Sequence, residues 1–167
     1  MKGGKVKNNI LILCLNNQYA RQIAKGLSSE LEMFYLDIND ILEYNLINDD
    51  MLDYAGQDYF EKEKLKTIKG LTQYESTMFA GNFELLSQDQ NLETLAKSAV
   101  IVYIGLTKDF LELQDKNSDE KFKHTLLAFE EEDNFCKSSA DVVCNCNGNL
   151  NEDLIIIKNE LVKYYDK

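Results

Sequence analysis

The chain has 167 residues, which is enough for one domain with a sizeable buried core. Its hydrophobic fraction of 44% and charged fraction of 28% are ordinary for a globular protein. A net charge of −11 disfavours binding to nucleic acid or to an anionic membrane surface, because phosphate groups would be repelled.

Two further features bear on location and chemistry. The apolar run after the basic start is too short for a signal peptide, and no run is long enough to span a membrane, so we expect a cytoplasmic protein with reduced cysteines. Among the 18 basic residues only Arg21 is an arginine. The chain therefore has one side chain suited to bidentate binding of a phosphate or carboxylate.

In chain order, apolar runs of strand length alternate with helical patterns. Strands are predicted at 10–15, 33–38, 77–80, 100–106 and 141–146, and helices at 19–32, 40–46, 57–71, 91–98, 108–114, about 121–138 and 152–165. Near-continuous apolar runs are typical of strands buried on both faces of a parallel sheet. The pattern predicts a single domain over 1–167, a three-layer α/β/α fold whose five-stranded parallel sheet has residues 10–15 at its centre.

The junction after the first strand has the outline of a phosphate-binding loop: an apolar run, a short polar loop and a helix. The Walker pattern at such a junction is G-x-x-x-x-G-K-[ST]. Laid on this sequence, it meets Cys14 and Tyr19 at the glycines, Ala20 at the lysine and Arg21 at the Ser/Thr. Every diagnostic position differs, although the loop at a helix N-terminus could still hold an anion weakly through backbone N–H groups.

Several strings in order resemble a known family. They are NILILCLNN with IAKGLSSEL, MFYLDINDILEY, AGQDYFEKEKLKTI, MFAGNFEL, AVIVYIGLTKDFL and SSADVVCNCNGNL. Together they resemble the shikimate kinases, small members of the nucleoside-monophosphate-kinase-like P-loop fold, over nearly the whole chain. The resemblance implies P-loop-kinase topology, a lid-like segment at about 115–135 and, in an active member, ATP and Mg as cofactors.

The resemblance also implies where the family's phosphate loop would lie. The corresponding residues form a degenerate loop made of Cys14, Asn16, Asn17, Gln18, Tyr19, Ala20 and Arg21. Tyr19 puts a phenol where a glycine normally lets the backbone approach a phosphate, and Arg21 puts a fixed positive charge at the magnesium-ligating position. We expect Tyr19 to fold over or into the former phosphate cavity, and Arg21 to pair with Asp37.

The substrate side implied by the resemblance is altered too. Its equivalents are Asp37 at the metal-associated position, Asn39 for a shikimate-contacting aspartate, Glu61 for a substrate arginine, and Gly81 and Asn82 within the glycine triplet. The lid Arg-Pro step falls on His124 and Thr125, and a second substrate arginine falls near Glu132 or Asp133. Such a site gains negative charge and should not bind a carboxylate. We assign no catalytic residue and no metal ligand.

Other groups have structural explanations that we favour over functional ones. Cys144 and Cys146 would share one face of a strand as buried residues rather than hold a metal, and Cys14 would pack under the loop rather than react as a thiolate. His124 and the acidic run 130–133 are expected at the surface. Tyr44, Tyr54, Tyr59 and Phe60 are expected to cap the second helical layer as core, the alternative being the lining of a small-molecule pocket.

These observations favour a shikimate-kinase-like protein that has lost phosphoryl transfer and has no enzymatic activity or cofactor. It would act in binding or regulation toward an unknown small molecule or protein partner, as a monomer or weak homodimer. One alternative is an active small-metabolite kinase with a non-Walker site, in which Arg21 neutralises charge and Asp37 holds Mg with ATP. A third is a plain homodimeric interaction module.

Overall fold

The computed structural model describes residues 7–45, 47–88, 90–107 and 119–166. Its elements in chain order are β1 (Asn9–Cys14), α1 (Asn17–Glu30), β2 (Phe34–Asp37), α2 (Ile38–Tyr44), α3 (Asp49–Ala55), α4 (Gln57–Gly70), the 3-10 turn η1 (Leu71–Gln73), β3 (Thr77–Ala80), α5 (Phe83–Leu86), α6 (Asn91–Ala96), β4 (Ala99–Gly105), α8 (Asp119–Ser139), β5 (Val142–Asn145) and α9 (Leu150–Tyr165). The predicted helix at 108–114 lies outside the described residues.

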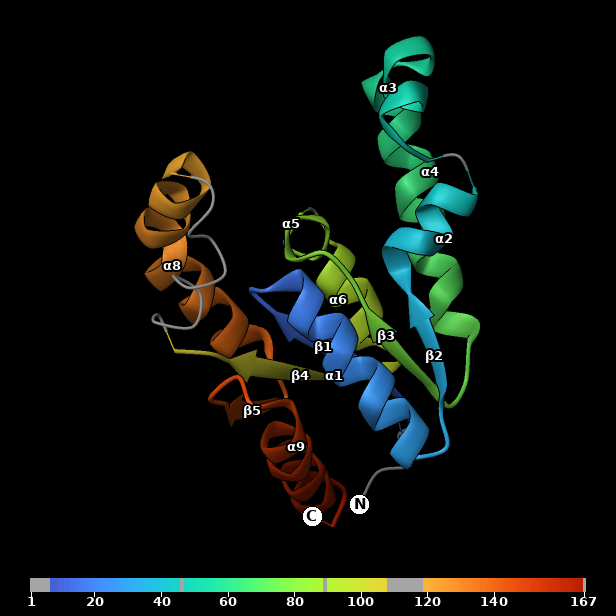
Figure 1. The fold of residues 1–167 in the computed structure, drawn as a ribbon. Helices are drawn as coiled ribbons and strands as arrows, with labels where there is room; N and C mark the ends of the chain where they lie inside the picture. Colours follow the sequence, from blue (N-terminus) through green and yellow to red (C-terminus); the bar gives the residue numbers. More distant parts are fainter. Residues whose placement is uncertain (1–6, 46, 89, 108–118, 167) are drawn as a thin grey trace.

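Within the described residues, five parallel strands form one sheet in the order β2-β3-β1-β4-β5 (Figure 1). In β1, Ile10 lies opposite Met78 of β3 on one side and Val100 of β4 on the other. The predictions of a parallel sheet and of a central first strand are confirmed. Parallel neighbours need crossover connections, and the helices between the strands supply them.

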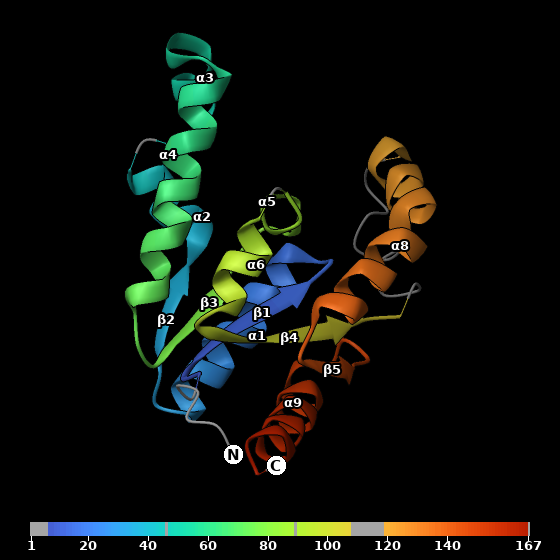
Figure 2. The ribbon, with the colours of Figure 1, turned by 180° about the vertical axis from the view of Figure 1, so that it is seen from behind.

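Alternate residues of β1 belong to two cores, one on each face of the sheet. Ile10 and Ile12 pack with the helices α1 and α9, whereas Leu11 and Leu13 pack with residues of α2, α4, α6 and α8. Figures 1 and 2 show these two helical layers from opposite sides. Because successive strand side chains point to opposite faces, one apolar run supplies both cores and confirms the predicted three-layer fold.

Asparagine or aspartate side chains begin most of the helices that surround the sheet. Asn16, Asp37, Asn48, Asn82 and Asn149 each accept a hydrogen bond from a backbone N–H in the first turn of the helix that follows. Such caps satisfy donors that have no partner inside the helix. They also explain two short helices, α3 and α5, that the apolar pattern did not predict.

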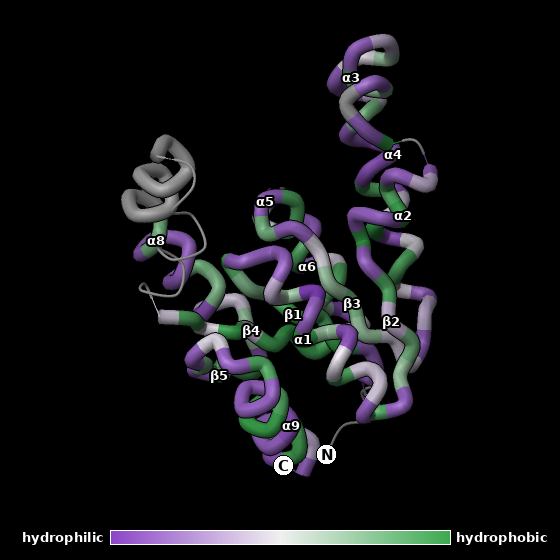
Figure 3. Tube along the Cα trace, viewed as in Figure 1, coloured by the Kyte–Doolittle hydropathy of each residue, from purple (hydrophilic) through white to green (hydrophobic). Residues whose placement is uncertain are grey.

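The helices α2, α3 and α4 form an arm whose outer part, α3 and the start of α4, projects beyond the carboxyl ends of the strands, while the end of α4 packs on the sheet (Figure 1). Hydrophobic residues concentrate at the central strands, while much of the outer arm is hydrophilic (Figure 3). The expectation that the arm's tyrosines are core is wrong: Tyr44, Tyr54 and Tyr59 are 87%, 76% and 49% exposed. The arm leaves the sheet, so no second layer covers them. Phe60 is partly buried against the core.

No helix in the described part of the chain combines the length and apolar character needed to cross a bilayer.

Candidate functional site

The loop between β1 and α1 is closed by its own side chains. The Asn16 side-chain oxygen accepts from the backbone N–H of Tyr19 at 2.8 Å, and its backbone oxygen accepts from Ala20 at 3.0 Å. An anion at a helix N-terminus would need donors of this kind. Asn16 therefore caps α1 and satisfies two backbone donors at the start of the helix.

A second side chain ties this loop to the β3–α5 loop. Asn17 accepts from the backbone N–H of Phe83 at 2.9 Å, and Asn39 accepts from that of Asn82 at 3.5 Å. Gly81, between them, packs under Ile38 and Leu86, each of which would lie 3.4 Å from an added Cβ atom. Asn17 is far from Gly81 and Asn82 in the sequence, and the parallel sheet brings the two loops to one edge.

Tyr19 and Ala20 both face the interior, whereas Gln18 is exposed. The Tyr19 hydroxyl donates to Oδ2 of Asp153 at 2.5 Å, so the ring is directed toward the β5–α9 loop. Burial, followed by the hydrogen bond and the charge of Asp153, raises the pKa of Tyr19. The phenol therefore stays protonated and acts as a donor.

Asp153, which the sequence analysis did not single out, is the acceptor around which this region is organised. It is fully buried and also accepts from the backbone N–H groups of Asn147 at 3.1 Å and Gly148 at 2.9 Å. Gly148 has φ of +92°, where a residue with a Cβ would be strained. An aspartate in the first turn of a helix, directly after an N-G-N turn, is a signal that could have identified it.

Arg21 and Asp37 form the ion pair that the sequence predicts. Arg21 Nε lies 2.8 Å from Asp37 Oδ2, with the arginine side chain 44% exposed and the aspartate side chain 4% exposed. The other oxygen of Asp37 accepts from the backbone N–H groups of Asn39 at 2.8 Å and Asp40 at 3.4 Å. The carboxylate at the metal-associated position is thus engaged by a guanidinium and by the first turn of α2.

Three of the substrate-pocket equivalents meet at one cavity of about 440 Å³ between the arm and the β3–α5 loop. We call it the arm cavity; it is lined by Asn39, Leu42, Glu43, Ile47, Asn48, Phe60, Glu61, Lys64, Asn82, Glu84, Leu85 and Gln88. Asn39, Glu61 and Asn82 are the equivalents it joins. Asp37 and Gly81 lie beside them in the chain but do not line the cavity.

Glu61, which the resemblance places at a substrate arginine position, forms an ion pair in the arm cavity. Lys64 Nζ lies 3.1 Å from Glu61 Oε2 and donates to Gln88 Oε1 at 3.0 Å, with the ammonium 5.0 Å from the ring centroid of Phe60. Lys64 is buried, so its charge acts at short range on its partner. The sequence analysis missed Lys64, although its spacing of three residues from Glu61 on a helix is the signal for such a pair.

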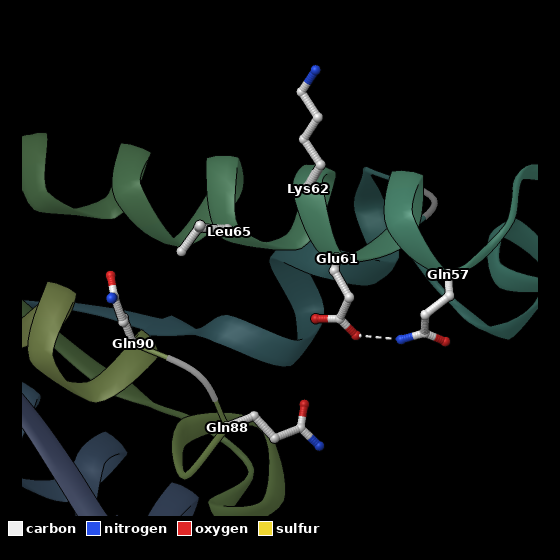
Figure 4. Close-up of a pocket in the computed structure, with 6 residues that line it drawn as sticks. All are labelled: Gln57, Glu61, Lys62, Leu65, Gln88 and Gln90. Atoms are coloured by element: carbon white, nitrogen blue, oxygen red, sulfur yellow. Dashed lines mark hydrogen bonds between the residues drawn. The ribbon is translucent and has the colours of Figure 1, made fainter.

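A second cavity of about 1070 Å³ lies beside the first, and Glu61 and Gln88 belong to both. Figure 4 shows Gln57 bonded to Glu61 from the same helix, with Gln88 facing them across the space and Lys62 pointing away. Gln90 also lines it. Gln57 therefore contacts the Glu61 side of the ion pair and Gln88 contacts the Lys64 side.

Asp133, near which the resemblance places a second substrate arginine, instead connects α8 to β4 and to its own helix. Asp133 of α8 accepts from the Tyr103 hydroxyl at 2.6 Å and lies 2.8 Å from Lys137 Nζ. Burial, and then the hydrogen bond to Asp133, raises the pKa of Tyr103. The side chains of His124 and Thr125 lie outside the described residues.

All four cysteines are free and buried. Cys14 is buried in the core, as expected for a thiol that packs under the loop. Burial raises its pKa to about 12, which favours the unreactive protonated form. Cys144 and Cys146 belong to the same core as Cys14, as a shared strand face predicts. Among the described residues, no three His, Cys, Asp or Glu side chains gather where they could hold a metal ion.

No family model matches the chain, and no curated protein matches it in sequence. Solved structures do match. The fold is similar to the shikimate kinase of Bacteroides thetaiotaomicron, with a TM-score of 0.75 and 13% identity over 92% of this chain and 98% of that one. For the shikimate kinase of Aquifex aeolicus the TM-score is 0.71 and the identity 16%, over 93% of this chain and 96% of that one.

A third similar structure is the shikimate kinase of Acinetobacter baumannii in complex with shikimate, with a TM-score of 0.69 and 18% identity over 96% of this chain and 94% of that one. A dephospho-CoA kinase from Campylobacter jejuni is more distant, with a TM-score of 0.54 and 12% identity over 95% of this chain and 98% of that one. The chain therefore has the fold of shikimate kinases and other P-loop kinases, as the resemblance predicts.

Proposed function

We propose that this chain is a binding protein built on the shikimate-kinase fold, without phosphoryl-transfer activity. The observation that carries the proposal is the ion pair between Arg21 and Asp37, in which Nε and Oδ2 are 2.8 Å apart. A magnesium ion held by Asp37 would have to displace a bound guanidinium. A phosphoryl-transfer site relies on that ion to neutralise the charge on the phosphates.

The loop supports the same reading in two further ways. Asn16 caps the helix through Tyr19 N–H, so a donor expected to bind phosphate is already used. Ala20 is completely buried in the core, so a lysine at this position would enter the core instead of reaching a phosphate. The replaced glycine and lysine positions and the pairing of Asp37 with Arg21 together support a binding role that uses neither ATP nor Mg.

The arm cavity is the part of the fold that we propose to be retained for binding. Its volume of about 440 Å³ lies within the range of about 300–1,000 Å³ that is usual for small-molecule sites. The lining combines polar residues with Leu42, Ile47, Phe60 and Leu85. Asn82 lines the cavity, and the next residue, Phe83, donates its backbone N–H to Asn17 of the β1–α1 loop. A small polar molecule bound in the cavity would therefore lie one residue away from a contact with that loop.

Titration with Mg-ATP, followed by backbone amide resonances, tests the loss of phosphoryl transfer. We expect no saturable shifts at residues 14–21 and no ADP release with or without shikimate. The Aquifex aeolicus shikimate kinase serves as the positive control under identical conditions. Arg21→Ser frees Asp37 from the guanidinium but should still release no ADP, because Asn16 and Tyr19 continue to close the loop and position 20 remains an alanine. Saturable shifts centred on residues 14–21, or ADP release by the wild type, would instead support a non-Walker kinase.

A further inference from the structure

We infer that the arm cavity takes an uncharged polyhydroxy compound of about monosaccharide size and rejects the same compound carrying a carboxylate. This inference rests on the proposed function, in which the cavity is the retained binding site. It concerns the ligand's chemical class, which follows from the charge and hydrogen-bond balance of the lining.

The one lysine that lines the arm cavity has no donor left for a ligand. An ammonium group has three N–H donors. At Lys64 they are engaged by the Glu61 carboxylate at 3.1 Å, by Gln88 Oε1 at 3.0 Å and by the face of the Phe60 ring. A ligand carboxylate would have to displace Glu61 or remain unpaired beside it, and either change weakens binding.

A cationic ligand also finds no unpaired carboxylate at Glu61. Glu61 is already matched by Lys64 and also accepts from Gln57 Nε2 at 2.8 Å. The remaining carboxylates of the lining, Glu43 and Glu84, are exposed. Solvent and salt screen exposed charges, so these two add little attraction for a cation and little repulsion of an anion. The buried lining therefore favours a ligand without net charge.

Side-chain amides supply the donors that such a ligand needs. Asn39, Asn48 and Asn82 each use the side-chain oxygen to accept from a backbone N–H, at 3.5, 3.2 and 2.8 Å. Among the described residues, their NH₂ groups and that of Gln88 have no hydrogen-bond partner. A hydroxyl both accepts and donates, so a ring bearing several hydroxyls can accept from these amides and donate to Glu43 and Glu84.

Shikimate and its methyl ester make a matched pair for the test, because they share one trihydroxylated ring and differ in charge. Each is titrated into the full chain, and the side-chain NH₂ resonances of Asn39, Asn82 and Gln88 are followed. We expect saturable shifts with the ester and at least ten-fold weaker binding of shikimate. Shikimate binding as tight as that of the ester, or no shift of these resonances with either compound, would overturn the inference.

Glu61→Gln sharpens the test, because it frees the Lys64 ammonium without changing the shape of the lining. Shikimate affinity should rise at least ten-fold, while that of the ester should change less than two-fold. Glu63→Gln makes the same charge change on α4 at a residue outside the cavity lining and should leave the preference as it is. An unchanged preference in Glu61→Gln would contradict the inference.

If Glu61→Gln does not fold, the double variant Glu61→Gln with Lys64→Gln replaces it. With neither charge present it should still prefer the ester, and a preference for shikimate would overturn the inference. Mg-ATP added to the same samples keeps the two proposals apart. Shifts of the backbone amides at residues 14–21 test the proposed loss of phosphoryl transfer. Shifts of the side-chain NH₂ resonances test the proposed ligand class.

Discussion

Arg21 in the second turn of α1 binds Asp37 at the end of β2 through Nε and Oδ2, which lie 2.8 Å apart. The two residues meet although β2 and β1 are separated in the sheet by β3. Asp37 simultaneously caps α2. One buried carboxylate therefore joins the first helix, the edge strand and the base of the arm.

Replacing Arg21 with alanine should lower the free energy of unfolding by about 1–2 kcal/mol, because the buried carboxylate loses its charged donor and keeps only backbone N–H groups. Asp37→Ala should cost more, since it also removes the cap of α2. Urea denaturation measures both. Gln22→Ala, at an exposed neighbouring position, is the control and should stay within about 0.5 kcal/mol of the wild type. Equal stability of the Arg21 and Gln22 variants would show that the ion pair contributes nothing.

Tyr19→Phe should destabilise the protein by about 1–3 kcal/mol, because it deprives the fully buried Asp153 of a hydroxyl donor. The matched control is Tyr165→Phe, which removes an exposed bond to the Lys7 carbonyl oxygen and should have little effect. Guanidinium denaturation of both variants compares them directly. A Tyr19→Phe protein as stable as the control would mean that Asp153 does not depend on this donor.

Burial raises the pKa of Cys14, Cys136 and Cys144 from 9.0 to about 12. Since the folded state holds these protons more tightly than the unfolded chain, their contribution to stability is fully present below about pH 9 and is lost as the pH rises toward 12. The urea midpoint should accordingly fall between pH 9 and pH 11.

Thiol labelling measures the burial of these cysteines independently. At pH 8 the native protein should react with a thiol reagent many times more slowly than the urea-unfolded protein. Prompt reaction of a thiol in the native state, assigned to Cys14 by peptide mapping, would show that the loop opens and exposes it.

Tyr103→Phe should loosen α8 from the sheet, because the Tyr103 hydroxyl donates to Asp133 at 2.6 Å from within β4. Hydrogen exchange at backbone amides 129–139 should speed up by about ten-fold, which corresponds to about 1.4 kcal/mol of lost protection. Ser138→Ala, which removes an exposed bond to the Phe135 carbonyl oxygen on the same helix, is the control. Unchanged exchange in Tyr103→Phe would indicate that packing alone holds α8.

Much of the architecture follows from local pattern. A near-continuous apolar run such as residues 10–15 is fully removed from water only when helices cover both faces of the strand. The hydrophobicity of the chain therefore indicates a strand, parallel pairing and the central place of β1. The partner of Arg21 was predictable for a related reason. The chain has a single arginine at the start of a helix, and parallel topology brings the end of the second strand to the same edge of the sheet.

The tertiary structure alone decided the long-range partner of Tyr19 and the exposure of the arm tyrosines. The Tyr19 hydroxyl donates to a residue 134 positions away in the sequence, and no local sequence pattern reveals that α1 and α9 are neighbours. The arm tyrosines are exposed because the helices that carry them leave the sheet, although their spacing would suit a buried face equally well. Spacing on α4 already brings Lys64 next to Glu61, but only the packing around α4 buries the lysine and so strengthens an attraction that would be weak in water. Periodicity specifies which face of an element is apolar, whereas the packing of elements against one another determines what that face and its polar neighbours meet.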